Sequence, residues 1–339
     1  MITLDDGASL AWRWRHHGLD SPLAAGVVVV AERVLAARAW PLPAAEEAFA
    51  VRQADPQAGA VESALRTGEL IQSYAFRGGS YVFTPEIGAV LMAVRTTSRA
   101  WESRRWQRQI VDDAVDWEAL RAAVREALAS GPATRAEIAS HLAGARSVAQ
   151  LAEAAATGAG ADSLYKPLHW WGDICFGPPR QGQSTFRWLR DDPHWPGLPD
   201  ADDAGRLAVR QYLRAYGPAT EANLSYWLTE GLSAPRSRVA GWLADLGDEV
   251  SAVTVAGVHA YVLTETLDDL QAAQPSDALK LLPAYDPWVM GPGTADSRIV
   301  PPERRRLLSN GAAALVRGGR VVGTWRLQDG ATSVSWFEE

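Results

Sequence analysis

Arginine supplies almost all the positive charge of this chain, and its positions indicate phosphate binding. Only Lys166 and Lys280 are lysines among 33 basic residues. The densest cluster sets five arginines against one acid, Glu102: Arg95, Arg99, Arg104, Arg105 and Arg108. Guanidinium groups bind phosphates bidentately and enter narrow minor grooves. We therefore expect the last four of these arginines to contact double-stranded DNA, although abundant arginine and alanine also accompany a GC-rich genome.

Side chains that commonly carry catalysis or bind metal are sparse. The single cysteine, Cys175, excludes an intramolecular disulfide and a multi-cysteine zinc site, and its apolar neighbours indicate a packing role. The six histidines are scattered, and His16 and His17 would point to different faces of one helix. No glycine-rich phosphate loop is present. We expect no metal and no cofactor.

The composition is that of a globular protein with two or three domains. No apolar run approaches the roughly 18 residues that a membrane helix needs, and the N-terminus lacks an export signal. We therefore expect a cytoplasmic protein that does not bind membranes, with a monomer favoured. The net charge of −7 weighs against attraction of the whole surface to nucleic acid, so local clusters matter more.

The tetrapeptide Gly-Pro-Ala-Thr occurs at 131–134 and again at 217–220, 86 residues apart. Each copy follows a helical stretch and opens a second helix, at 134–142 and 220–228. A third helix and two strand-like runs follow each time. This spacing is too long for a solenoid repeat, and three helices with a hairpin are typical of a winged helix. The alternative is that Gly-Pro-Ala-Thr is only a helix-breaking turn that arose twice.

Local chemistry supports the repeat. The glycine of each copy can take the left-handed conformation that ends the preceding helix. Thr134 can cap the next helix, and Glu137 completes a capping box. Thr220 caps in the second copy, where Asn223 at the third position predicts a weaker box.

We therefore predict an α+β fold of tandem winged-helix units with a β-rich C-terminal domain, for which a barrel is one option. The units are expected at 1–111, 112–195, 203–264 and 275–339, with a linker at 190–202 that is rich in Asp, Pro and Gly.

Two further details of this plan bear on binding. We expect a helix at 101–111, and a third helix of the second unit at 162–171 with Pro167 in its first turn or at a kink. Hairpin turns at 77–79 and 178–184 carry Arg77, Arg180 and Gln181. These three side chains can touch phosphates or a minor groove, and the alternative for the second turn is a solvated loop.

Four stretches, in this order and spacing, resemble a known family: residues 70–84, 172–189, 281–291 and 319–325. They are similar to the winged-helix family of bacterial DNA glycosylases that unhook interstrand crosslinks and excise bulky alkylated bases. The resemblance implies tandem winged helices, a C-terminal β-domain and duplex DNA, damaged in the active members, as the partner.

This chain differs from the family it resembles at the catalytic motif. The family carries Gln-x-Gln or Gln-x-Asp near the end of the second N-terminal helix, and that position falls on Arg38 and Trp40 of this chain. Gln53 and Asp55 spell Gln-x-Asp, but they lie too close to Leu70 to hold the family register. The alternative is that the family's catalytic motif aligns one helical turn away from Arg38 and Trp40.

Base excision needs a group that orients water and stabilises an oxocarbenium-like transition state. Arg38 accepts no hydrogen bond and is always charged, and Trp40 accepts no proton. We therefore predict a DNA-binding protein, with Arg38 among the contacts, whose excision chemistry is lost or altered. An active glycosylase for bulky alkylated or toxin-derived adducts is the first alternative. A module on the same fold that binds another protein or a small molecule is the second.

Overall fold

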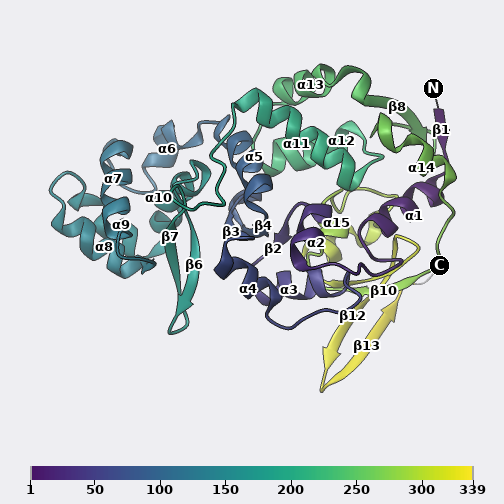
Figure 1. Cartoon of the computed structure of the whole chain (residues 1–339), viewed down its shortest axis with the longest axis horizontal. Helices are drawn as coiled ribbons and strands as arrows, with labels where there is room; N and C mark the ends of the chain where they lie inside the picture. The colour runs from purple at the N-terminus through teal and green to yellow at the C-terminus, as the bar shows by residue number, and fades with distance from the viewer. Residues whose placement is uncertain (1, 338–339) are drawn as a thin grey trace.

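The computed structural model describes residues 2–337 and shows a mixed α+β fold with four small sheets (Figure 1). Up to residue 111 the strands are β1 (Ile2–Leu4), β2 (Ala37–Arg38), β3 (Ile71–Tyr74) and β4 (Ser80–Phe83). The helices there are α1 (Asp6–His16), α2 (Val27–Val34), α3 (Pro43–Ala50), α4 (Ala60–Thr67), α5 (Pro85–Thr96) and α6 (Arg104–Gln107). Within the described residues, no helix is both long and apolar enough to cross a membrane.

The remaining elements follow in three groups. The first comprises α7 (Trp117–Ala127), β5 (Ala133–Thr134), α8 (Arg135–Gly144), α9 (Ala152–Ala156), α10 (Gly158–Trp170), β6 (Ile174–Arg180) and β7 (Gln183–Trp188). The second comprises α11 (Ala201–Tyr216), α12 (Glu221–Leu224), a π-helical stretch (Ser225–Gly231), α13 (Arg236–Asp245), β8 (Val250–Val255), β9 (Val258–Leu263) and α14 (Leu267–Ala272). The third comprises β10 (Leu279–Leu282), α15 (Pro287–Met290), α16 (Arg305–Ser309), β11 (Ala313–Arg317), β12 (Arg320–Gln328) and β13 (Ala331–Trp336).

One strand order recurs along the chain. The sheets β2-β4-β3 and β5-β7-β6 each place a short first strand beside the last of the three. In the third case Ala219 alone takes the place of the first strand and pairs with Tyr261 of β9, which in turn pairs with β8. A helix precedes each first strand or bridge, and further helices separate it from the hairpin: α3 and α4 after β2, α8 to α10 after β5, and α12, the π-helical stretch and α13 after Ala219.

The two Gly-Pro-Ala-Thr copies occupy equivalent places in these sheets. The alanine pairs with the last strand, Ala133 with Phe186 and Ala219 with Tyr261. The threonine then caps the next helix with a closed capping box. The second box also closes, because the Asn223 side chain accepts the Thr220 backbone N–H at 2.9 Å.

The two glycines differ from each other and from the expectation. Gly131 has φ of 125°, whereas Gly217 has φ of −64°, so the left-handed end expected there is wrong. A Cβ atom on Gly217 would lie 2.4 Å from the Leu213 carbonyl oxygen. Glycine is therefore required at this position because there is no room for a Cβ atom, and not because φ is positive.

Two expected helices have different bounds. The helix expected at 101–111 is a 3₁₀ turn followed by the four-residue α6, because Ser103 caps a new start. Helix α10 begins at Gly158, so Pro167 lies inside it rather than in its first turn. A proline there leaves the carbonyl of Ser163 without its helical donor. The indole Nε1 of Trp106 donates to that carbonyl at 3.0 Å, so the helix tolerates the proline.

The start of the chain lies away from the rest of its expected unit. Strand β1 pairs in parallel with β8, with Ile2 opposite Val253, and extends the sheet of β8 and β9. Helix α1 packs beside α14. Residues 2–16 thus join the sheet near residue 253 to the remainder of the molecule.

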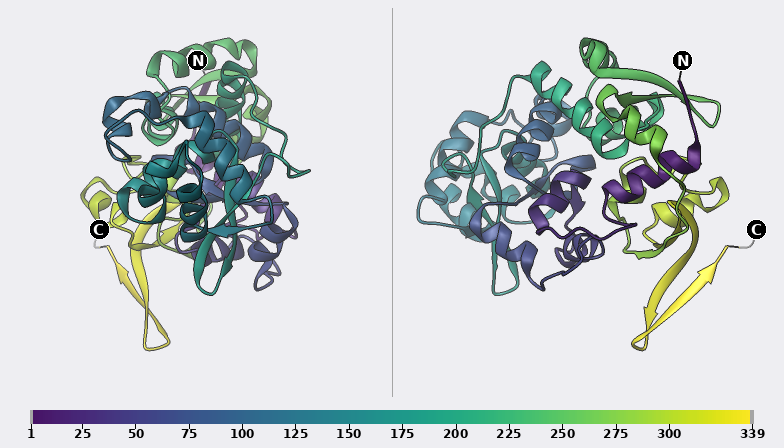
Figure 2. Two further views of the ribbon diagram at one scale, coloured as in Figure 1. Left: turned by 90° about the vertical axis from the view of Figure 1, so that its left-hand side faces the viewer. Right: turned by 45° about the vertical axis from the view of Figure 1, so that its right-hand side comes forward.

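The barrel option for the C-terminal domain is wrong for the described residues. Strands β10-β11-β12-β13 form an open antiparallel sheet with β10 and β13 at its edges. The β12–β13 hairpin extends away from the body (Figures 1 and 2). Leu327 near its turn is 69% exposed and Trp336 at its base is 52% exposed, so no further strand covers these side chains as a closed barrel would.

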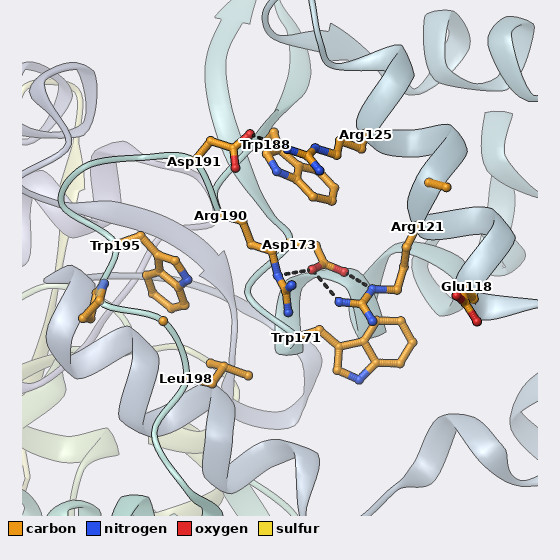
Figure 3. A pocket seen from close by; sticks show the side chains of 13 residues that line it. Glu118, Arg121, Arg125, Trp171, Asp173, Trp188, Arg190, Asp191, Trp195 and Leu198 are labelled. Carbon is orange, nitrogen blue, oxygen red and sulfur yellow. Dashed lines mark hydrogen bonds and ion pairs between the residues drawn. The ribbon is translucent and has the colours of Figure 1, made fainter.

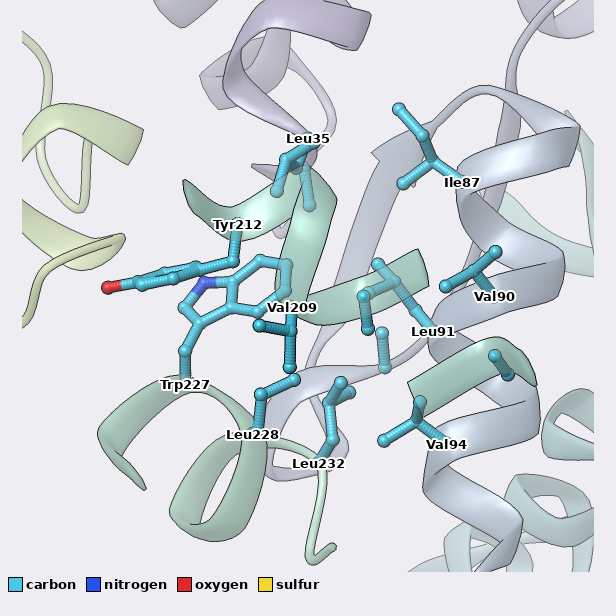
Figure 4. Packing of buried hydrophobic residues seen from close by; sticks show 14 of the residues in the cluster. Leu35, Ile87, Val90, Leu91, Val94, Val209, Tyr212, Trp227, Leu228 and Leu232 are labelled. Atoms are coloured by element: carbon cyan, nitrogen blue, oxygen red, sulfur yellow. The ribbon is translucent and has the colours of Figure 1, made fainter. Parts of the chain in front are cut away.

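The largest hydrophobic core joins segments that are distant in sequence. Helix α5 packs against α11, and the π-helical stretch covers the same cluster (Figure 4). Leu91 and Val94 of α5 and Val209 of α11 are buried in it. This core fixes β3 and β4 relative to α11, and it thereby holds the cleft described next.

Candidate functional site

A cleft of about 650 Å³ separates β2 and its neighbours from the elements around α10 and β7. We call it the Arg38 cleft. One wall is formed by residues of the first sheet: Arg38, Trp40, Tyr74, Gly78, Gly79 and Ser80. The other wall is formed by residues between 134 and 184: Thr134, Arg135, Ala136, Ala156, Asp162, Phe176, Gln183 and Ser184.

Arg38 ends β2 and pairs with Tyr81 of β4. Its guanidinium carbon lies 4.0 Å from the centroid of the Tyr285 ring, in a cation–π contact. Arg38 also borders a smaller recess, which Arg77 and Tyr226 line as well. The residue expected at the catalytic position thus stands where two cavities meet.

Tyr285 is itself held by a rigid loop. Asp286 follows it, and the Asp286 side chain caps α15 by accepting the Trp288 N–H at 2.7 Å. Asp286 also accepts from both terminal nitrogens of Arg52, at 2.9 and 2.6 Å, and neither of these two side chains is exposed. The position of Asp286, after a strand and before Pro287, indicates this capping role.

Trp40 is 66% exposed in the wall of the cleft. Between it and Arg38, the Ala39 carbonyl accepts from the side chains of Gln72 at 3.0 Å and Ser80 at 3.1 Å. These bonds fix the backbone, so both side chains project from an anchored strand. Neither side chain provides an acceptor that could orient water.

The opposite wall carries a carboxylate that sequence reasoning missed. Asp162 of α10 lies 2.7 Å from Arg135 and 3.8 Å from Lys166. Tyr74 donates its hydroxyl to Asp162 at 3.5 Å, and burial, with this carboxylate next, raises the pKa of Tyr74 to about 12. Only the fold brings Asp162, 124 positions after Arg38, to the same cleft.

The predicted contacts on the hairpin turns lie near the cleft walls. Arg77 takes a left-handed conformation with φ of 48°, and its guanidinium stacks on Tyr226 at 4.1 Å. Arg180 and Gln181 form the tip of the β6–β7 hairpin, where the exposed Arg180 pairs with Glu137. That ion pair ties the hairpin to the start of α8.

The arginine cluster lies elsewhere. Arg104, Arg105 and Arg108 are exposed, and Arg99 is exposed but bonded to Glu102 at 2.8 Å. Helix α6 and the β6–β7 tip lie at opposite ends of this part of the molecule (Figures 1 and 2). The two sets of predicted DNA contacts therefore form two surfaces. Arg95 belongs to neither, because it is buried over Trp170.

The second Gln-x-Asp pair is not part of the cleft. Gln53 is 9% exposed, and its side-chain nitrogen donates to the Ala25 carbonyl at 2.8 Å. Asp55 is exposed, and neither residue lines the Arg38 cleft.

The isolated histidines and the cysteine form no metal site within residues 2–337. His169 is buried against Ser73 at 2.8 Å, and burial lowers its pKa well below the usual value. Cys175 is buried as well, and burial raises the pKa of its thiol to about 12. Both side chains serve packing.

Comparison with known proteins agrees with the geometry. Residues 31–335 match the family model described as DNA glycosylase AlkZ-like. An interstrand DNA cross-link repair glycosylase of Streptomyces sahachiroi is 30% identical over 335 residues, which cover 97% of this chain and 90% of that protein. The solved structure of Streptomyces sahachiroi DNA glycosylase AlkZ superposes with a TM-score of 0.92 at 28% identity, covering 99% of this chain and 91% of that one. The resemblance seen in the sequence is confirmed, and the chain belongs to the AlkZ-like DNA glycosylase family.

Proposed function

We propose that this chain binds duplex DNA as a monomer in the cytoplasm, and that its base-excision chemistry is lost or altered. In this proposal residues 1–111, 112–195 and 203–264 are three winged helices, and 275–339 form a C-terminal domain. The support is the strand order that recurs in β2-β4-β3, in β5-β7-β6 and around Ala219. Each unit then contains a hairpin that can serve as a wing.

The Arg38 cleft is the proposed DNA site. Arg38 and Arg135 supply positive charge, and the exposed ring of Trp40 supplies a stacking surface. The β6–β7 and β12–β13 hairpins extend in the same direction in every view (Figures 1 and 2). A duplex lying across that side would meet both hairpins and the mouth of the cleft.

One observation carries the proposal of altered chemistry. The side chain at the motif position, Arg38, is a cation stacked 4.0 Å from Tyr285. A fixed positive charge opposes the positive charge that develops on the sugar during excision. It also cannot take a proton from the attacking water. The same charge favours binding to the phosphate backbone. Arg38 therefore strengthens DNA affinity and at the same time opposes base excision.

The test of DNA binding is fluorescence anisotropy with a labelled duplex at low salt. Trp40→Ala and Arg38→Gln are each expected to weaken binding by about tenfold, the value of one lost stack or charged contact. Arg214→Gln and Leu279→Ala are the matched controls, since Arg214 is 52% exposed on α11 and Leu279 is 46% exposed on β10. Unchanged affinity in both cleft variants would exclude the cleft as the DNA site.

A second candidate function rests on Asp162. It is the one carboxylate among the described residues that line the Arg38 cleft. A carboxylate can orient water and stabilise an oxocarbenium-like transition state. The chain would then be an active glycosylase for bulky alkylated or toxin-derived adducts, with Asp162 in place of the family's amides. Release of such an adduct by the wild type, abolished in Asp162→Asn, would establish this function.

A further inference from the structure

A second cavity, of about 880 Å³, lies between α7 and the segment that follows β7 (Figure 3). It shares no lining residue with the Arg38 cleft. Three indole side chains line it: Trp171, Trp188 and Trp195. All three are partly exposed, so aromatic surface remains open to a ligand.

A buried carboxylate orders two guanidinium groups in this cavity. Asp173 is unexposed; it accepts hydrogen bonds from Arg121 at 2.5 and 2.9 Å and forms an ion pair with Arg190 at 2.8 Å. These contacts use Nε and Nη2 of Arg121 and Nε of Arg190. Further N–H groups of both arginines remain as donors, and Figure 3 shows the two guanidinium groups between Trp171 and Trp195.

The indole walls are also held in place. Trp171 packs edge-on against Trp101 at 5.2 Å and Trp117 at 5.5 Å, and Arg121 lies 5.0 Å over its ring. On the other side, a Cβ atom on Gly172 would lie only 2.5 Å from the ring of Trp195. The walls are therefore fixed before any ligand enters, which reduces the entropy cost of binding.

The charges that line the cavity balance. Arg125 pairs with Asp191 at 3.2 Å, Asp173 holds two arginines, and Glu118 is the remaining acid. A neutral planar ligand suits a balanced lining better than a bare anion does. An entirely apolar ligand would leave the free guanidinium donors without partners. The ligand must therefore be flat, aromatic and equipped with hydrogen-bond acceptors.

We propose that this cavity binds a guanine base, stacked on indole and held at its acceptor edge by Arg190 or Arg121. Guanine presents two adjacent acceptors, O6 and N7, which an arginine binds bidentately. Adenine presents a donor beside N7, which would face a guanidinium donor. The base comes either from a free nucleotide or from an unpaired position of a DNA strand. This inference does not depend on excision in the Arg38 cleft.

Calorimetry on the full chain tests the inference with four probes: guanosine monophosphate, adenosine monophosphate, and two single-stranded oligothymidines, one with a central guanine and one with a central adenine. We expect a guanine probe to bind about tenfold more tightly than its adenine counterpart. Binding of the free nucleotide identifies a mononucleotide site, and binding of the oligonucleotide alone identifies an unpaired base in a strand.

Trp195→Ala and Arg190→Gln are each expected to weaken that binding by about tenfold. Arg214→Gln is the matched control, because Arg214 is 52% exposed and ion-paired, and Arg190 is 53% exposed. Circular dichroism melting checks that each variant is folded. If Trp195→Ala does not fold, then Arg190→Gln alone tests the proposal. No binding of any guanine probe, equal affinity for adenine, or equal loss in Arg214→Gln would overturn the proposal.

Discussion

Asp286 and Arg52 form a fully buried ion pair, with both terminal nitrogens of Arg52 within 2.9 Å of the carboxylate. The pair joins the segment after α3 to the loop that carries Tyr285, on which Arg38 rests. Burial of one partner without the other is costly, because the remaining charge loses both water and its counter-ion. This pair therefore stabilises the fold and also fixes one side of the Arg38 cleft.

Asp286→Ala is expected to lower the free energy of unfolding by about 3–5 kcal/mol. Urea denaturation gives the value. Arg214→Ala, which breaks an exposed pair with Glu265 at 2.9 Å, is the control and should cost about 0–1 kcal/mol. A loss in Asp286→Ala no larger than in the control would show that the buried pair does not stabilise the protein.

The two capping boxes give a second stability prediction. Thr134→Ala and Thr220→Ala each remove a hydroxyl that accepts a helix N–H, at 3.3 Å and 3.2 Å, and each should cost about 1 kcal/mol. Serine at either position keeps the hydroxyl and should remain close to the wild type. If serine and alanine destabilise equally, then packing of the threonine methyl group, rather than capping, explains the loss.

The repeat was predictable from the sequence because its signals are local. Thr134 with Glu137 is a capping box within one turn, and the same tetrapeptide opens the equivalent helix of each copy. The Arg38 cleft was not predictable as a whole. Asp162, Tyr285 and Arg38 converge only through packing of distant elements, and the sequence gives no signal for such contacts. The interior Pro167 depends on a tertiary bond from Trp106, which periodicity does not reveal.

Buried histidines predict a pH dependence of stability. Burial lowers the pKa of His16 to about 4 and that of His17 well below its usual value. The unfolded chain therefore takes up protons below about pH 6.5 while these histidines stay neutral in the folded state. Stability is present above that pH and is lost as the pH falls, by up to about 1.4 kcal/mol per pH unit for each such histidine.

Urea denaturation between pH 7.5 and pH 5 measures this slope. His17→Gln should flatten it, whereas His141→Gln, which changes an exposed histidine, should leave it unchanged. An unaltered slope in His17→Gln would show that His17 does not contribute to the pH dependence.

Salt dependence separates the two arginine surfaces. If Arg104 and Arg105 contact phosphates, each substitution by glutamine should flatten the log–log slope of affinity against salt by about 0.9. Arg180→Gln tests the hairpin surface in the same way. Since α6 and the β6–β7 tip lie at opposite ends of this part of the molecule, we expect a short duplex to contact one surface, and only substitutions on that surface to change the slope. A salt-independent affinity, or no binding at low salt, would contradict phosphate contacts at either surface.

The central claim is that Arg38 and Trp40 leave the family's motif position without a group that orients water for simple alkylated bases. The most direct measurement is release of 7-methylguanine from alkylated duplex DNA by the wild type and by the Arg38→Gln, Trp40→Gln double variant. We predict no release by the wild type and measurable release by the double variant, in which two amides stand in the cleft. Clear turnover by the wild type, unaffected by changing Arg38 or Trp40, would contradict the account.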